Sequence, residues 1–426
     1  MNKSDSERMA GRLAELGYRQ SLNKYRADLV VINTCGVRQT AEDRIYGLVP
    51  KIKKENPNVK IVLTGCLVGR EDVKRRLKEY VDVWLPISQI SNSQFPISKI
   101  PPAPFIKGEE CDDYLKIKPK YISSFSAFVP IGNGCNNFCS YCVVPYARGR
   151  EVYRPVKDIL AEVRGLVKKG YKEIILIAQN VNSYRSLTPP SPPLSRGEKI
   201  DFADLLKMVN DIPGDFWIRF LTSHPKDMSD ELIKTVAGCE KVCHQVHLPI
   251  QAGDDAVLKA MNRKYTVERY AELIKKVRQA MPDASITTDI IVGFPGETRK
   301  QFNNTAKLMR QVKFDMAYIA RYSVRPGTAA AKLKDDVSKT EKKRREQELM
   351  KILRKTALEN NKKYLGKIVE ALVEGRNGRG ELFGRTETAK SVKILTGDFR
   401  LVGKFIYVKI LQVKDFGMEG VLMNYE

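Results

Sequence analysis

The chain has 426 residues, of which 42% are hydrophobic, enough for the cores of several ordinary domains. Lysine and arginine total 74 against 50 acidic residues, so the formal net charge is +24. This excess favours a polyanionic partner such as nucleic acid, the alternative being that lysine only keeps the surface soluble. No apolar run approaches the ~18 residues of a membrane span, and the polar start lacks an export signal. We therefore expect a cytoplasmic protein.

Residues 1–90 predict an N-terminal α/β domain of Rossmann-like kind. Ser6–Leu16 has helical spacing, while Asp28–Thr34 and Lys60–Gly65 are short apolar runs that predict buried parallel strands. A cysteine follows each strand at once, namely Cys35 and Cys66. Ligands collect at the carboxyl ends of strands in open α/β sheets, so this pair predicts a metal site. The alternative is that both are small buried hydrophobes.

Residues 91–125 predict a linker, and residues 126–356 predict a core of alternating strands and helices. That alternation favours a parallel sheet, closed or nearly closed as a (β/α) barrel, with its chemistry at the carboxyl ends of the strands. The proline- and serine-rich stretch 185–199 predicts a disordered surface insertion. The expected strands are Glu173–Ala178, Trp217–Leu221, Val246–Pro249, Ser285–Val292 and Met316–Arg321. The strand ends carry Gln179-Asn180, Thr222-Ser-His224, Gln251-Ala-Gly253 and Gly293-Phe-Pro-Gly-Glu297.

The last domain is expected over residues 357–426, and from about Gly366 it alternates apolar and polar residues in short runs separated by glycines. This pattern predicts a small antiparallel β-barrel of OB-like kind, preceded by a basic helix over residues 338–364. Arg376, Arg385 and Lys390 surround its predicted turns. Basic turns on a small barrel are a common way to bind RNA.

Three further cysteines, Cys135, Cys139 and Cys142, form a C-x-x-x-C-x-x-C run without a fourth cysteine nearby. Three thiolates hold three irons of a cubane iron–sulfur cluster and leave one iron open to a small molecule. A zinc knuckle is the alternative, but zinc sites usually add a second pair or histidines, and none lies near. Disulfides are not expected in a long chain without an export signal.

Two more cysteines, Cys239 and Cys243, precede His244 and His247. This arrangement could be a metal site. We expect both cysteines to be structural, because unpaired cysteine commonly packs as a small hydrophobe.

Several motifs together resemble the radical S-adenosylmethionine methylthiotransferases. They are the Cys135–Glu151 segment, Gln179–Tyr184, His247–Gly253, Met261–Arg263, Asp289–Thr298 and Tyr322–Thr328, in the family's order. Leu382–Glu387 resembles the RNA-binding TRAM domain at that family's C-terminus. The resemblance covers nearly the whole chain apart from residues 185–199, and it implies a radical S-adenosylmethionine core between the N-terminal and TRAM domains.

The resemblance implies two [4Fe–4S] clusters and S-adenosylmethionine as cofactors. Cys135, Cys139 and Cys142 are implied to hold the first cluster, and Cys35 and Cys66 to be ligands of the second. Residues at the predicted barrel mouth are expected to hydrogen-bond the polar groups of S-adenosylmethionine. The expected cofactor contacts are Asn180, Gln251, Gly253, Arg263 and Asp289.

Tyr146 and Arg148 closely follow the first cluster's loop. We expect them to position the target base, by stacking and by phosphate contact. The competing role is packing over the cluster.

The family's branches differ in substrate. The segment Cys139–Glu151 and the run Gly384–Thr386 are most similar to the branch that modifies isopentenyl-adenosine beside the tRNA anticodon. The alternatives are threonylcarbamoyl-adenosine in tRNA, an aspartate of a ribosomal protein, or an RNA-binding protein without catalysis. Expected partners are tRNA, an electron donor such as a flavodoxin, and a sulfur donor or cluster carrier. We expect a monomer.

One departure from the family concerns the second cluster. The family uses three N-terminal cysteines, the first lying just before a Met-Asn-x-x-Asp-Ser-Glu segment. Here that segment is Met1–Glu7, so the first cysteine and the strand before it would lie upstream of residue 1. We expect a misassigned start rather than a truncated protein, because Cys35 and Cys66 keep their places.

Overall fold

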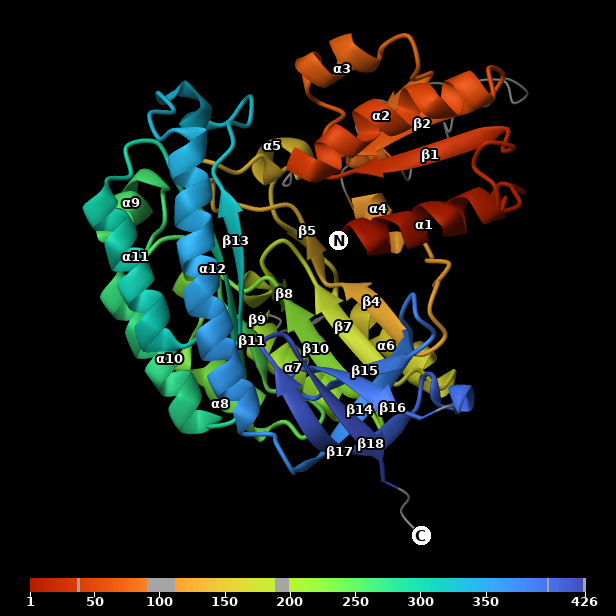
Figure 1. Cartoon of the computed structure of the whole chain (residues 1–426). Coiled ribbons are helices and arrows are strands. Elements are labelled where there is room, and N and C mark those ends of the chain that lie inside the picture. Colours follow the sequence, from red (N-terminus) through yellow and green to blue (C-terminus); the bar gives the residue numbers. More distant parts are fainter. Residues whose placement is uncertain (37–38, 90–111, 188–198, 397, 424–426) are drawn as a thin grey trace, which may run out of the picture. The chain divides into compact units, whose positions relative to one another are not determined.

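The computed structural model describes residues 1–36, 39–89, 112–187, 199–396 and 398–423 (Figure 1). These residues form two compact units. The first consists of Met1–Ile122, Pro130–Arg154 and Ser323–Lys332, and the second of Ser123–Val129, Pro155–Tyr322 and Leu333–Glu426. None of the helices in the described ranges has the length and apolar character needed to cross a bilayer.

A parallel sheet lies in the middle of the first unit, with helices on both faces. Its elements are α1 Asn2–Glu15, β1 Leu29–Thr34, α2 Gln39–Glu55, β2 Lys60–Gly65, α3 Glu71–Leu77, β3 Val83–Leu85 and α4 Asp112–Lys116, with the strand order β1-β2-β3. Ile61 and Leu63 of β2 pack with α2 and α3, while Val62 packs with residues of α1 and α4. Because successive side chains of a strand point to opposite faces, this apolar run needs cover on both sides.

Both strands expected before Cys35 and Cys66 are present, and β2 has the predicted bounds. Within the described residues β1 pairs only with β2, so it is an edge of the sheet, and five of its six residues are only half-buried. The expected linker, residues 91–125, partly lies outside the described residues. Its described part includes α4, whose Tyr114 and Leu115 are buried, so this part belongs to the core of the unit.

A second part of the first unit carries the cysteine run. It contains β5 Gly132–Asn133, α5 Val144–Arg148, β6 Val152–Tyr153 and the 3-10 turn η4 Ala329–Lys332. Strands β5 and β6 pair in antiparallel fashion. The loop from Cys135 to Cys142 leaves β5 and enters α5, so both of its ends are held by regular structure.

The second unit alternates strands and helices, as the sequence predicts. Its parallel strands have the orders β10-β7-β4 and β11-β12-β13. The strands are β4 Ser126–Pro130, β7 Glu173–Ile177, β10 Trp217–Leu221, β11 Gln245–His247, β12 Ser285–Val292 and β13 Met316–Arg321. The helices are α6 Val156–Lys168, α7 Phe202–Asn210, α8 Asp230–Gly238, α9 Asp255–Ala260, α10 Val267–Ala280, α11 Arg299–Val312 and α12 Lys339–Lys362. The prediction of a (β/α) core is confirmed, although β4 was missed.

The expectation of a disordered insertion over residues 185–199 is wrong at its ends. Arg185–Leu187 forms β8, which pairs in antiparallel fashion with β9, Lys199–Asp201. The Ser186 hydroxyl accepts a hydrogen bond from the backbone N–H of Val156, 3.3 Å away, which ties β8 to the start of α6. The centre of the insertion, residues 188–198, lies outside the described residues.

The C-terminal part of the second unit is a closed β-barrel with the order β14-β15-β16-β18-β17. Its strands are β14 Ile368–Arg376, β15 Leu382–Thr386, β16 Ser391–Leu395, β17 Phe405–Lys414 and β18 Gly417–Leu422. Alternate side chains, such as Ile406, Val408 and Ile410, fill its core. The prediction of a small OB-like barrel is confirmed, with one refinement: β16 and β18 pair in parallel, whereas the other pairs are antiparallel.

Candidate functional site

The backbone that leads into the Cys135–Cys142 loop adopts a conformation that requires glycine at position 134. Gly134 has φ +83°, and a Cβ there would lie 1.9 Å from the carbonyl oxygen of Arg150, so a larger residue cannot be accommodated. The N–H of Cys135 donates to the carbonyl of Gly149 at 3.1 Å, and the N–H of Cys142 donates to that of Cys139 at 3.0 Å. These hydrogen bonds therefore fix the backbone from which the cysteine side chains extend.

Burial makes Cys135 and Cys142 poor acids on their own. Burial raises the pKa of Cys142 to about 12, and the nearby Cys139 and Cys135 add to this. Burial also raises the pKa of Cys135. Thiolates that bind metal must be deprotonated, so a cationic group is needed to hold all three in that form. None of the three forms a disulfide with another described residue.

The described residues contain no group of three His, Cys, Asp or Glu side chains close enough to hold a single metal ion. A cubane presents a different iron to each thiolate, so its ligands are spread over the faces of the cluster. The donor set, three thiols on one glycine-supported loop, therefore fits an iron–sulfur cluster with one open iron.

Cys35 and Cys66 lie next to this loop within the first unit. A Cβ placed on Gly36 would come within 3.1 Å of the Cys66 Cβ and 3.2 Å of the Val143 Cγ2. The turn after Cys35, the turn after β2 and the residue after Cys142 thus pack against one another. The structure brings the two predicted groups of cysteines together.

Arg148 and Tyr146, the residues expected to position the base, have different environments. The Arg148 side chain is 2% exposed; its Nη2 lies 2.5 Å from Asp5 Oδ2 and its Nη1 donates to Asn133 at 3.1 Å. Burial of this kind leaves no accessible group for a phosphate, so the competing role, internal packing, suits Arg148 better. Tyr146 is 62% exposed and makes an edge contact with Phe138, which leaves its ring open for stacking.

The carboxyl ends of β7 and β10 form a polar edge in the second unit. Both side-chain amide atoms of Gln179, the Oδ1 of Asn180 and the Oγ of Ser223 are buried there without a hydrogen-bond partner. Asn180 donates its Nδ2 to Asp227 Oδ2 at 2.7 Å. Buried polar groups are nearly always paired, so unpaired ones at a strand end indicate a missing ligand. The predicted site included Asn180 but missed Gln179 and Ser223, although both were noted at strand ends.

A strained turn holds Ser223 in place. Thr222, a β-branched residue, has φ +69°, a conformation that costs free energy and usually persists at functional sites. Its hydroxyl donates to the Ala178 carbonyl at 2.6 Å, and the N–H of His224 donates to Asn182 Oδ1 at 2.8 Å. These bonds clamp the turn after β10 to the turn after β7.

His224 is kept neutral beside this edge. Burial lowers its pKa to about 2, with Arg263 and Lys226 contributing. Its Nδ1 accepts a hydrogen bond from the N–H of Lys226 at 3.2 Å. The imidazole therefore supplies a fixed dipole rather than a charge at neutral pH.

The remaining predicted cofactor contacts surround the loop after β11. Gln251 is buried with φ +72°, and its N–H donates to the Asp289 carbonyl at 2.9 Å. Arg263 donates a hydrogen bond from Nη2 to the Pro249 carbonyl at 2.8 Å, which holds the same loop in place. Asp289 lies within β12 rather than at its end, with a carboxylate 3.4 Å from His247 Nε2.

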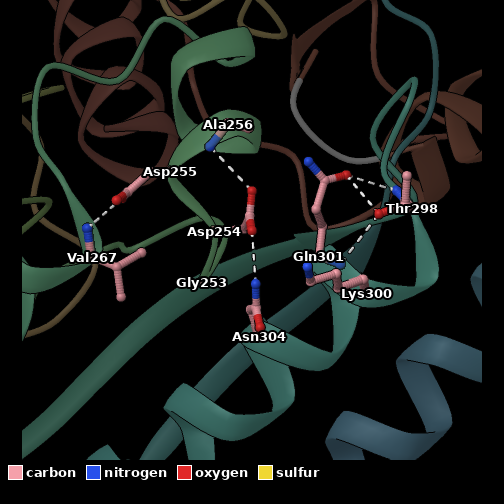
Figure 2. Close-up of a pocket in the computed structure, with 9 residues that line it drawn as sticks. All are labelled: Gly253, Asp254, Asp255, Ala256, Val267, Thr298, Lys300, Gln301 and Asn304. Atoms are coloured by element: carbon pink, nitrogen blue, oxygen red, sulfur yellow. Dashed lines mark hydrogen bonds between the residues drawn. The ribbon is translucent and has the colours of Figure 1, made fainter.

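Gly253 packs against α11 and borders an open pocket of about 490 Å³ (Figure 2). A Cβ on Gly253 would lie 2.6 Å from the Thr305 Cα, so glycine is required for this close approach. Figure 2 shows that the polar groups here pair with one another: Asp254 accepts from Asn304 at 2.8 Å and Asp255 from the N–H of Val267 at 2.7 Å. This pocket is a network of helix caps rather than a reactive site.

Cys239 and Cys243 are buried at 8% and 1% exposure, in agreement with the structural role expected for them. Cys243 packs with Trp217 and Leu372. Burial raises the pKa of its thiol to about 12.

The predicted RNA contacts of the small barrel have unequal exposure. Arg376 is exposed and lies 3.3 Å over the ring of Phe399. Arg385 is partly buried between Glu374 and Glu173. Lys390 is buried, with its Nζ 2.6 Å from Asp315 Oδ1. Within the described residues, Arg385 and Lys390 are paired with carboxylates, whereas Arg376 is not. Because Lys390 is also buried, the structure points to an internal role for it.

Comparisons with known proteins match three successive parts of the chain. Family models match residues 1–86 (Uncharacterized protein family UPF0004), 129–309 (Radical SAM superfamily) and 362–423 (TRAM domain). The chain is similar to the radical S-adenosylmethionine methyltransferase TsrM from Kitasatospora setae, with a TM-score of 0.48, 11% identity, and coverage of 77% of this chain and 73% of that one. By its domains, this chain is a radical S-adenosylmethionine protein that ends in a TRAM domain.

Three curated relatives are named tRNA-2-methylthio-N(6)-dimethylallyladenosine synthase. The protein from Clostridium botulinum (strain Langeland) is 40% identical, over 99% of this chain and 94% of its own length. The one from Clostridium tetani is 41% identical, over 99% and 93%. The one from Thermoanaerobacter pseudethanolicus is 44% identical, over 100% and 91%. The chain belongs to the tRNA-2-methylthio-N(6)-dimethylallyladenosine synthase family.

Proposed function

We propose that this chain is a radical S-adenosylmethionine methylthiotransferase that modifies carbon 2 of isopentenyl-adenosine beside the tRNA anticodon. The observation that carries the proposal is the glycine-supported loop that holds Cys135, Cys139 and Cys142, in a chain 40% identical to a relative named for this reaction. The net charge of +24 and the TRAM match support an RNA substrate. We also propose a cytoplasmic location, which a tRNA substrate favours.

We propose that Cys135, Cys139 and Cys142 hold a [4Fe–4S] cluster. When bound, this group supplies the electron for reductive cleavage of S-adenosylmethionine. Gln179, Asn180 and Ser223 offer unpaired buried polar atoms that would bind and orient polar groups of the cofactor. Neutral His224 and the strained turn keep that edge rigid, so little reorganisation accompanies binding.

Cys35 and Cys66 would supply thiolates to a second cluster. Their packing against the turn after Cys142 supports this role over that of two isolated buried hydrophobes. The double variant Cys35→Ala/Cys66→Ala should lose about half of the bound iron after anaerobic reconstitution, while the triple variant of the other loop loses the remainder. Equal iron in the double variant and in the unaltered protein would overturn the second site.

Exposed Tyr146 is the residue we propose to stack on the target base, because its ring faces solvent directly after the cysteine loop. Arg148 would instead fix that loop by its buried contact with Asp5. The Tyr146→Phe variant should retain most tRNA modification, whereas Tyr146→Ala should weaken it.

The proposed reaction is tested by nucleoside analysis of digested tRNA from cells with and without the gene. The 2-methylthio derivative of isopentenyl-adenosine should disappear without the gene and return with the intact gene, but not with a Cys139→Ala copy. Loss of a threonylcarbamoyl-adenosine derivative, or of a mark on a ribosomal protein, would redirect the substrate assignment. No change in any of these would support RNA binding without catalysis.

A further inference from the structure

The small barrel of β14–β18 is attached to the central sheet through a buried arginine. Arg219 of β10 donates from Nη2 to the carbonyl of Thr386 and from Nη1 to that of Glu387, both at 2.7 Å. Its Nε donates to Glu173 Oε1 at 2.7 Å, and its side chain is 2% exposed. One guanidinium therefore joins the barrel's β15 end to two strands of the core.

Other contacts also join the barrel to the core. Lys390 of the barrel lies 2.6 Å from Asp315, directly before β13. The ring of Phe405 packs on that of Trp217 with centroids 4.6 Å apart. Glu387 Oε1 accepts from the N–H of His244 at 3.3 Å. The attachment thus combines buried charges with apolar packing, and separating the two parts would leave charges without partners.

This attachment lies at the amino-terminal ends of the core strands. Glu173 is the first residue of β7, and Trp217 is the first of β10. The unpaired polar atoms of Gln179 and Ser223 lie at the opposite, carboxyl ends. Figure 1 shows the small barrel beside the strands of the core. A five-residue strand such as β7 is about 17 Å long, so a ligand that touches both the barrel and the carboxyl edge must span at least that distance.

We propose that Arg219 is a positioning residue that fixes the TRAM barrel on the core, so that only an extended RNA gains affinity from both ends of the sheet. The exposed basic residues of the barrel, among them Arg376, Arg379, Lys404 and Lys409, would contact RNA far from the reacting base. The inference rests on the proposed tRNA substrate and adds a length requirement to it. A short loop oligonucleotide reaches the carboxyl edge only.

The conservative variant Arg219→Lys tests the proposal with the full-length protein. Lysine keeps a positive charge beside Glu173 but lacks the planar fork needed to reach both carbonyls. Phe405→Ala is a second variant, which weakens the attachment from the barrel side without removing a charged side chain, although it also removes the ring contact of Lys172. Leu411→Ala, on the same strand but 50% exposed, is the matched control.

Two measurements are made on each protein. The first is hydrogen exchange of the backbone amides of Arg385–Lys390, which reports release of the barrel. The second is the dissociation constant for unmodified tRNA and for a short anticodon-loop oligonucleotide of the same sequence, which needs no catalysis. Arg219→Lys and Phe405→Ala should speed exchange and weaken tRNA binding about tenfold, while oligonucleotide binding changes less than about twofold. Leu411→Ala should change neither.

Equal weakening for tRNA and oligonucleotide, or no weakening for tRNA despite faster exchange, would overturn the proposal. Unchanged exchange in both attachment variants would also overturn it, since Arg219 would then not hold the barrel. Failure of the proposed reaction has a separate signature: the unaltered protein would bind tRNA and show the same exchange pattern but produce no 5′-deoxyadenosine.

Discussion

The two ends of the core sheet in the second unit contrast sharply. At the amino end, Arg219 and Glu173 are buried and paired with each other, and the partly buried Asp315 is paired with Lys390. At the carboxyl end, Gln179 and Ser223 have buried polar atoms without partners, next to a strained backbone. One end therefore contributes stability, while the other gives up stability to keep binding groups available. This is the division expected of (β/α) folds, and it can be tested by substitutions at either end.

The largest expected effect is at the amino end. Arg219→Met leaves the buried carboxylate of Glu173 without its closest cationic partner, which should lower the free energy of unfolding by about 3–5 kcal/mol. Urea unfolding monitored by circular dichroism measures this. Lys207→Met, which removes an exposed pair with Glu231, is the control and should leave the midpoint unchanged. A similar small effect for both variants would contradict the view that the amino end of the sheet contributes stability.

A pH dependence should come from His224 at the carboxyl end. Its pKa is lowered from 6.5 to about 2 in the folded state, so only the unfolded chain takes up this proton as the pH falls below about 6.5. The stability contributed by neutral His224 is thus complete above that pH and declines below it, by about 1.4 kcal/mol per pH unit. His224→Asn retains an acceptor for the N–H of Lys226 and should remove this part of the slope between pH 6 and pH 5. An identical slope in the variant would show that His224 is not buried in neutral form.

Ser223→Ala should separate stability from binding. Removing a buried hydroxyl without a partner should leave the free energy of unfolding unchanged or raise it by up to about 1 kcal/mol. Affinity for S-adenosylmethionine, measured by calorimetry on the reconstituted protein, should fall about three- to tenfold. Lower stability with unaltered cofactor affinity would mean that Ser223 has a partner and plays only a structural part.

The smallest effect is expected on the barrel surface. Arg376→Ala removes an exposed guanidinium that stacks on Phe399, and should weaken tRNA binding by about 0.5–1 kcal/mol, or two- to fivefold, equally across tRNA sequences. The salt dependence of binding should also become shallower. Arg400→Ala, which removes an arginine already paired with Asp398, is the comparison. Equal effects would argue against a specific role for Arg376.

Much of the fold follows from local patterns in the sequence. The apolar run Lys60–Gly65 predicts β2 with its observed bounds, because a buried parallel strand needs an uninterrupted apolar segment between polar turns. Ser126–Pro130, which forms β4, is shorter and ends in proline, so its strand character is weak in isolation. The helix α4 was missed for a similar reason, since a five-residue helix derives its stability from tertiary packing.

The candidate site residues likewise differ in how far the sequence alone predicts their role. Spacing alone predicts Cys135, Cys139 and Cys142 as cluster ligands, because ligands of one cluster can lie on one short loop. The burial of Arg148 and Lys390 depends on partners far away in the sequence, Asp5 at a separation of 143 residues and Asp315 at 75. A basic residue in a turn looks the same in a sequence whether it faces RNA or a buried carboxylate, so these partners emerge only from the folded chain.

The central claim is that the loop of Cys135, Cys139 and Cys142 supports radical cleavage of S-adenosylmethionine and thereby methylthiolation of tRNA. The most direct measurement follows 5′-deoxyadenosine and the 2-methylthio nucleoside together, in one anaerobic reaction of reconstituted, reduced protein with tRNA that contains isopentenyl-adenosine. We predict that both products form, and that Cys139→Ala forms neither. A protein with its full iron content that yields no 5′-deoxyadenosine would contradict the claim.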